Sequence, residues 1–112
     1  MADTPTIDPA TFAELQDAAG ADFVVELVNT FLEEAPGMLA ELRAAQAAGN
    51  AEAFRRAAHS LKSNSNTFGA TQLGLMARDL ELGGLVADTA PVDALEAAYQ
   101  TAAAALQERT RG

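Results

Sequence analysis

The chain has 112 residues, no cysteine, 5% aromatic residues and a formal net charge of −9. A chain of this length fits one domain with one hydrophobic core, and the missing cysteines exclude disulfide frameworks and thiolate metal sites. The negative charge argues against nucleic acid as a partner, because binding to a phosphate backbone needs concentrated positive charge. We expect one domain over residues 1–112, with residues 1–7 flexible.

Two helices are predicted in the first half of the chain. Asp8 has the side chain of a helix N-cap and Pro9 suits the first helical position, so a short helix begins there and ends at Gly20. Asp22 is the predicted cap of the next helix, and Pro36-Gly37 is expected to kink that helix or to split it in two. The apolar positions of this second helix are Phe23, Leu27, Phe31, Met38, Leu42 and Ala45.

Three further helices are predicted after residue 49. Asn50 is a cap residue, and the third helix runs from about residue 51 to residue 66. A fourth helix follows Gly69 and stops near Gly83-Gly84, and Pro91 opens the last one. The apolar faces of these two helices consist of Leu73, Met76, Ala77 and Leu80 and of Val92, Leu95, Tyr99, Ala102 and Leu106. No segment alternates with a period of two, so we predict an all-α fold, an antiparallel up-down-up-down four-helix bundle with a short extra N-terminal helix.

The third helix contains the only histidine of the chain, His59. At about 100° per residue, the side of this helix opposite His59 carries Phe54, Ala57, Leu61, Ser65 and Phe68. The residues within about 60° of His59 are Glu52, Arg55, Arg56, Lys62, Ser63 and Asn66. We therefore expect His59 at the centre of the polar face. Two interpretations remain: a plain surface histidine, or an imidazole presented for chemistry.

An exposed imidazole surrounded by cations is suited to nucleophilic attack on phosphorus. The neutral ring nitrogen is a good nucleophile near neutral pH, and nearby cations disfavour the imidazolium form. A transferred phosphoryl group spreads negative charge over its oxygens, and Lys62, three residues after His59, is placed to stabilise that charge. Ser63 lies one residue further, where a small side chain leaves room above the ring. The alternative is an ordinary solvated helix face of mixed charge.

The segment Ala58-His59-Ser60-Leu61-Lys62-Ser63, with Gly69 ten residues after the histidine, resembles the histidine-containing phosphotransfer (HPt) domain. That family has the pattern His-x-Leu-Lys-Gly, followed by a glycine at the same later spacing. The resemblance covers nearly the whole chain and includes the helix order, Phe31-Leu32-Glu33 in the second helix and Leu80-Glu81 after the motif. It implies the fold of a helical bundle and a function in a phosphorelay.

The resemblance also implies a role for each matching position. His59 would be phosphorylated on its exposed ring nitrogen, and Lys62 would stabilise the phosphoryl group. Glu81 stands where related domains carry a glutamate or glutamine that hydrogen-bonds the imidazole, and a solvated helix carboxylate is the alternative. Gly69 would turn the chain between the two central helices. Ser63 departs from the family, which most often has glycine there, but serine is small enough that we expect phosphotransfer activity to survive.

The partners implied by the resemblance are response-regulator receiver domains and a hybrid histidine kinase. The receiver would supply Mg²⁺. We expect no cofactor or metal on this chain, because one histidine without cysteines leaves only carboxylates, and their spacing shows no metal-binding loop. No phosphate-binding loop is present, so we expect a phosphocarrier without autonomous kinase activity rather than an enzyme. The residues expected to contact a receiver are Arg55, Arg56, Ser63, Asn66 and Arg78. The alternative function is a non-phosphorylated helical-bundle adaptor that binds a signalling partner.

The N-terminus lacks the features of a signal peptide and no apolar segment is long enough to span a bilayer, so we expect a cytoplasmic protein without membrane contact. Nothing in the sequence calls for a second subunit, and we expect a monomer.

Five apolar residues exceed what one narrow core stripe per helix needs, namely Val24, Val25, Val28, Leu75 and Leu82. They either widen the core faces, which we favour, or form an exposed docking patch beside the histidine.

Overall fold

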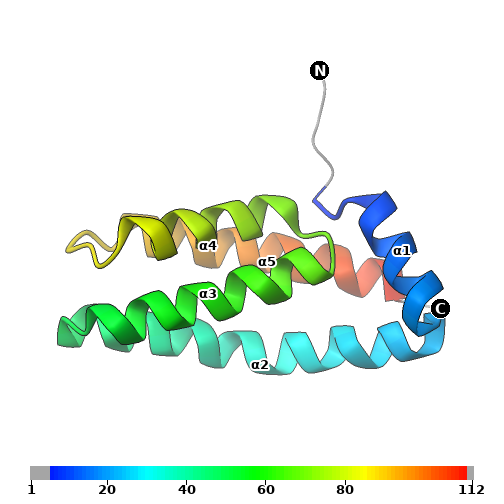
Figure 1. The fold of residues 1–112 in the computed structure, drawn as a ribbon, viewed down its shortest axis with the longest axis horizontal. Coiled ribbons are helices and arrows are strands. Elements are labelled where there is room, and N and C mark those ends of the chain that lie inside the picture. The colour runs from blue at the N-terminus through cyan, green and yellow to red at the C-terminus, as the bar shows by residue number, and fades with distance from the viewer. Residues whose placement is uncertain (1–5, 111–112) are drawn as a thin grey trace, which may run out of the picture.

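The computed structural model describes residues 6–110, and these residues contain helices but no strand. The helices are α1 (Pro9–Ala19), α2 (Ala21–Ala48), α3 (Ala51–Thr67), α4 (Thr71–Gly83) and α5 (Ala90–Thr110) (Figure 1). The predicted all-α class is confirmed, and the predicted helix positions agree closely with these bounds.

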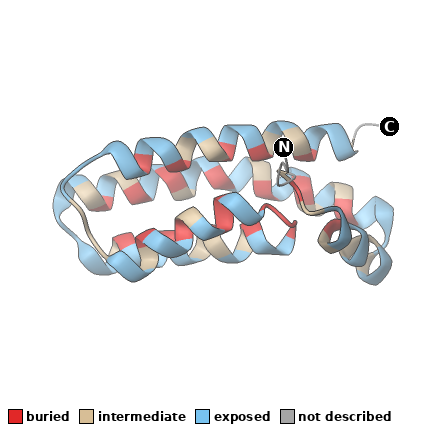
Figure 2. Cartoon of the chain, turned by 90° about the horizontal axis from the view of Figure 1, so that it is seen from above, coloured by how far each residue is buried: buried red, intermediate tan, exposed pale blue. Residues whose placement is uncertain are grey.

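Four of the helices lie side by side, and α1 lies at one end of them (Figure 1). α2 packs against α3 and α5, and α4 packs against the same two helices. α1 contacts α2 and α3. Each helix turns its buried residues toward the others and its exposed residues outward (Figure 2). One face of α3 is therefore left open to solvent.

Side chains cap two of the helices as predicted. The Asp8 carboxylate accepts a hydrogen bond from the backbone N–H of Thr11 at 3.3 Å, and Pro9 follows in the first helical position. The Asn50 side chain accepts from the backbone N–H of Ala53 at 3.1 Å. These bonds satisfy N–H groups that have no acceptor within the helix, so α1 and α3 begin where the sequence predicts.

The start of α2 differs from the prediction. Gly20 stands at the N-cap position and makes no side-chain hydrogen bond, while Asp22 lies within the first turn. The expectation that Asp22 caps the helix is therefore wrong. A carboxylate in the first turn still interacts favourably with the positive end of the helix dipole.

Pro36 does not split α2, which runs unbroken over 28 residues. A proline lacks the N–H group, so the carbonyl of Leu32, four residues earlier, has lost its helical donor. That carbonyl accepts a hydrogen bond from the hydroxyl of Tyr99 on α5 at 3.4 Å. Burial raises the pKa of Tyr99 above its ordinary value, at which the hydroxyl is already protonated at neutral pH and able to donate. A side chain from another helix thus satisfies the carbonyl that the proline leaves free.

The buried stripe of α2 is shifted by one residue at three predicted positions, because Val24, Val28 and Leu39 are buried in place of Phe23, Leu27 and Met38. Phe23, expected in the core, is 51% exposed, whereas Val24 and Val28 are fully buried. Apolar residues occupy both candidate stripes, so the helical spacing alone does not choose between them. The docking-patch interpretation is therefore wrong for Val24 and Val28, while Leu75 and Leu82 of α4 are exposed. The buried residues of α2 are Val24, Val28, Phe31, Ala35, Leu39, Leu42 and Ala45.

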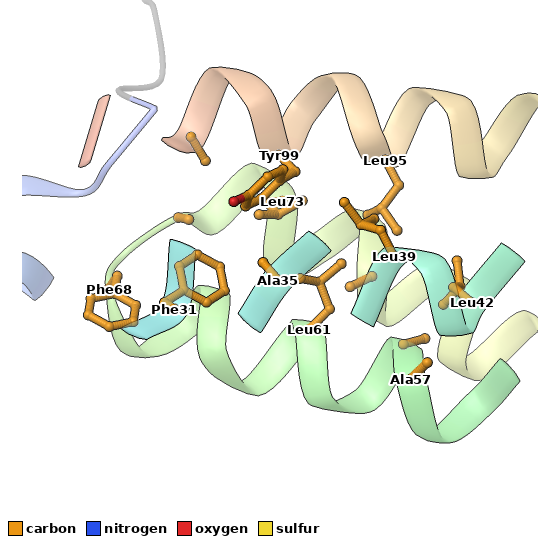
Figure 3. Packing of buried hydrophobic residues seen from close by; sticks show 14 of the residues in the cluster. Phe31, Ala35, Leu39, Leu42, Ala57, Leu61, Phe68, Leu73, Leu95 and Tyr99 are labelled. Atoms are coloured by element: carbon orange, nitrogen blue, oxygen red, sulfur yellow. The ribbon is translucent and has the colours of Figure 1, made fainter. Parts of the chain in front are cut away.

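The core positions predicted for α3 and α5 are all buried. Phe31 of α2 stacks on Phe68 with ring centroids 5.3 Å apart, and it meets Tyr99 edge-on at 6.1 Å (Figure 3). Leu61 is buried in the same core (Figure 3). Because two residues span about 200° of a helix, an inward Leu61 requires that His59 faces outward.

Gly69 joins α3 to α4 under two constraints. Its φ of 80° lies in the left-handed region that favours glycine. Its carbonyl accepts a hydrogen bond from the N–H of Asp8 at 2.8 Å, and a Cβ atom on Gly69 would lie 3.0 Å from the Asp8 carbonyl oxygen. The segment before α1 packs on this turn, and Ile7, expected in a flexible segment, is buried. Residues 1–5 of that segment lie outside the described residues.

Gly69→Ala is expected to lower the free energy of unfolding by about 2–3 kcal/mol, because it combines backbone strain with a tight contact. Gly49→Ala is the matched control, because Gly49 has a φ of 70° but no atom within 4 Å of a Cβ position. Backbone strain alone is expected to cost that variant about 1–2 kcal/mol. Urea denaturation of both variants measures the difference, and equal losses would contradict close packing of Asp8 on Gly69.

Candidate functional site

His59 projects from the open face of α3. Its neighbour Ala58 and the core residue Leu61 are buried, whereas the His59 side chain is 53% exposed. The imidazole is thus anchored by a helix whose opposite side is fixed in the core. One part of the ring is accessible to a partner molecule.

Glu81 of α4 fixes the orientation of the imidazole. Its Oε2 atom lies 2.7 Å from Nδ1 of His59, although the two residues are 22 positions apart in the chain. A carboxylate only accepts hydrogen bonds, so the neutral ring carries its proton on Nδ1 and donates it to Glu81. The lone pair then resides on Nε2. Because only 12% of the Glu81 side chain is exposed, this acceptor is held by its surroundings.

Lys62 holds the second oxygen of the same carboxylate. Its Nζ atom lies 2.8 Å from Oε1 of Glu81, and 25% of the lysine side chain is exposed. Oε1 is itself shielded from solvent. Contact with the Lys62 ammonium, and then the hydrogen bond with His59, lower the pKa of Glu81. The carboxylate consequently stays ionised at neutral pH, and it bridges the Lys62 ammonium and the His59 imidazole of α3.

The lowered pKa of Glu81 makes its contribution to stability depend on pH. A depressed carboxyl pKa stabilises the folded protein above the ordinary carboxyl range, and that contribution is lost as the pH falls through the lowered pKa. Glu81→Gln is therefore expected to lower the melting temperature at pH 7, and to have progressively less effect as the solution is acidified below the carboxyl range. Thermal melts across that range test this, with Glu14→Gln at an exposed position of α1 as the control. A loss that is independent of pH would contradict the ion pair.

The cations expected to surround His59 lie close to acidic side chains. Arg55 lies 3.8 Å from Glu52 on its own helix. Arg56 lines an open groove of about 450 Å³ between α2 and α3. The other residues along this groove are Glu33, Glu34, Gly37, Met38, Glu41, Ala57 and Ser60. Lys62 is paired with Glu81, so two of these three cations are paired with a carboxylate, and Arg56 shares its groove with three glutamates.

The remaining residues predicted to contact a partner are exposed. Ser63 and Asn66 continue the open face of α3 beyond His59, and Arg78 lies on the outer side of α4. The structure therefore brings His59, Lys62 and Glu81 into direct contact and leaves the others around them. Sequence reasoning considered Glu81 as a partner of His59 but missed its contact with Lys62. Lys62 lies about 60° around α3 from His59, and the sequence alone does not say which neighbouring helix that side of α3 faces.

Within residues 6–110, no group of three or more histidine or acidic side chains is arranged to hold a metal ion. None of the helices in the same residues has the length and apolar character required to cross a membrane.

Comparisons with known proteins agree with this geometry. The Hpt domain family matches residues 26–105. The chain is also similar to the crystal structure of histidine-containing phosphotransfer protein B (HptB) from Pseudomonas aeruginosa PAO1, with 27% identity, a TM-score of 0.86 and 97% of each chain covered. No curated protein matches the chain. With its family match spanning α3 and the His59 site, this chain belongs to the Hpt domain family and acts in histidine phosphotransfer within phosphorelays.

Proposed function

We propose that Nε2 of His59 accepts a phosphoryl group from an aspartyl phosphate of one receiver domain and passes it to an aspartate of another. The nitrogen lone pair forms the P–N bond while the P–O bond to the aspartate breaks, and the receiver carboxylate leaves. The second receiver reverses these steps. The hydrogen bond from Nδ1 to Glu81 supports this assignment, because it directs the lone pair to the exposed nitrogen.

We propose that Glu81 also stabilises the positive charge that develops on the imidazole ring. When Nε2 forms its bond to phosphorus, the ring acquires positive charge that the neutral imidazole did not carry. A carboxylate 2.7 Å from Nδ1 stabilises that charge, and it does so without reorganisation because Lys62 already holds it. The proton on Nδ1 stays on the ring throughout.

Lys62 is proposed to stabilise the phosphoryl group during transfer. It lies one helical turn from His59, and its ammonium group is close enough to Glu81 to be near the same imidazole. A cation beside the equatorial oxygens lowers the energy of the transferred group as its charge spreads. The ammonium would then be shared between the Glu81 carboxylate and the phosphoryl oxygens.

Lys62→Ala is expected to slow phosphoryl transfer roughly tenfold or more, because it removes this charge and releases Glu81. The fold should persist, because the lysine lies outside the core. Stopped-flow or quenched transfer from a phosphorylated receiver measures the rate, and a thermal melt checks the fold. Lys62→Arg keeps the positive charge but changes its geometry. Its transfer rate is expected to lie between those of the wild type and of Lys62→Ala. An unchanged rate in Lys62→Ala would remove the assigned role.

We propose that residues 1–112 form one domain, an antiparallel up-down-up-down bundle with α1 as the extra helix. Short connections and the contacts of each long helix with two neighbours support this arrangement. Hpt proteins are phosphocarriers that interact with receiver domains and kinases of two-component systems. For this chain we propose a cytoplasmic monomer without autonomous kinase activity or cofactor, supplied by a hybrid kinase, with Mg²⁺ held by the receiver.

Incubation with a phosphorylated receiver domain tests the proposed function. We expect a label on this chain that is lost in acid and stable in base, as a phosphoramidate bond is. Failure of the folded protein to take label from several receivers would overturn it. The adaptor alternative, which carries no phosphate, predicts that failure and is not favoured by the family match.

A further inference from the structure

Gly74 of α4 is a buried glycine within a helix, and its missing side chain makes room for another residue. A Cβ atom built on Gly74 would lie 2.2 Å from Oδ1 and 3.2 Å from Cγ of Asn66 on α3. The other described glycines differ in kind. Gly20, Gly49, Gly69 and Gly84 have positive φ angles, and Gly37 and Gly83 have no atom within 4 Å of a Cβ position. Gly74 is therefore the described glycine whose Cβ position is taken by a side chain of the neighbouring helix.

This arrangement works against helix propensity. Glycine inside a helix costs about 0.5–1 kcal/mol relative to alanine, so alanine would suit α4 better in isolation. What alanine would displace is the tip of the Asn66 side chain, whose residue is exposed overall. An exposed side chain turns away more easily than two packed helices separate. The expected response to a methyl group at Gly74 is that the Asn66 amide swings outward.

Asn66 lies where a docked receiver has to fit. It follows His59 by seven residues on α3, which places it about 10 Å along the helix and within about 20° of the same direction. A specific protein interface covers about 800 Å² on each partner, equivalent to a disc of radius ~16 Å. A receiver that brings its aspartate to Nε2 of His59 therefore covers Asn66. An amide raised from this surface would hold the two proteins apart.

We propose that Gly74 is a docking determinant for receiver domains, because it lets the Asn66 side chain lie down between α3 and α4. Gly74 touches neither the phosphoryl group nor the receiver, and it acts through the position of Asn66. This inference rests on the proposed transfer through His59. It adds a residue that controls how closely the receiver approaches.

The experiment measures phosphoryl transfer at increasing concentrations of phosphorylated receiver, for the wild type, Gly74→Ala, Asn66→Ala and the double variant. Gly74→Ala is expected to raise the receiver concentration for half-maximal transfer at least fivefold, while the maximal rate changes less than twofold. In the Asn66→Ala background, the same Gly74→Ala change is expected to shift half-saturation by less than 1.5-fold. A thermal melt of each variant verifies the fold.

Two results would overturn the inference. One is an unchanged receiver concentration for half-maximal transfer in Gly74→Ala. The other is an equal rise of this concentration on Gly74→Ala in the wild-type and the Asn66→Ala backgrounds, which would indicate that the helices have been displaced. Failure of the proposed function is recognised separately. In that case the wild type itself takes no label at His59, either from the receiver or from phosphoramidate as a small-molecule donor.

Discussion

His59→Gln is expected to abolish phosphoryl acceptance while leaving the melting temperature almost unchanged. The variant removes the nucleophilic nitrogen, and an amide nitrogen has no lone pair available for attack on phosphorus. The His59 side chain is 53% exposed and lies outside the buried core, so its removal opens no cavity. Glutamine also offers an amide N–H that can donate to Glu81.

Transfer assays and thermal melts on the same preparation test both halves of this expectation. The rate should fall below detection, because no second histidine exists in the chain to replace His59. A residual label in the variant would place the acceptor elsewhere. A large loss of stability would show that the imidazole supports the fold, and the loss of transfer would then have a trivial cause.

Leu61→Ala is expected to lower the free energy of unfolding by about 2–5 kcal/mol. Leu61 of α3, two residues after the histidine, is buried in the hydrophobic core of the bundle. Truncation of its side chain removes apolar contacts and leaves a cavity. The effect is a large fraction of the stability of a small domain. It also bears on function, because the inward position of Leu61 determines the outward position of His59.

The matched control for this variant is Leu82→Ala on α4. Leu82 is 69% exposed, so the same substitution is expected to change the stability by no more than ~0.5 kcal/mol. Urea denaturation of both variants measures the difference. Equal effects at the two positions would contradict the helix phase on which the site depends.

Helix phase could be predicted from the sequence where one apolar stripe stands alone. In α3, charged and polar residues surround the stripe that contains Phe54 and Leu61, so only one face can be buried. In α2, both Phe23 and Val24 begin an apolar stripe, and packing against α3 and α5 together decides between them. The carbonyl that Pro36 leaves free in α2 accepts a hydrogen bond from the Tyr99 hydroxyl of α5, a contact that no local pattern reveals.

Only those features of the candidate site that lie on a single helix could be predicted from the sequence. The exposure of His59 and the proximity of Lys62 follow from positions on α3. The bridge from Lys62 through Glu81 to His59 depends on how α3 and α4 align, since its acceptor lies 22 residues from the histidine. The spacing of charges in the sequence likewise did not indicate that Arg56 lines a groove together with acidic residues. Contacts between helices therefore set the electrostatics around the ring.

The most direct test of the central claim is an NMR assignment of the phosphorylated nitrogen in ¹⁵N-histidine-labelled protein. The hydrogen bond of Nδ1 to Glu81 predicts that phosphorus couples to Nε2 of His59, with Nδ1 still protonated. A phosphoryl group on Nδ1, or a label that survives acid on another residue, would contradict the account.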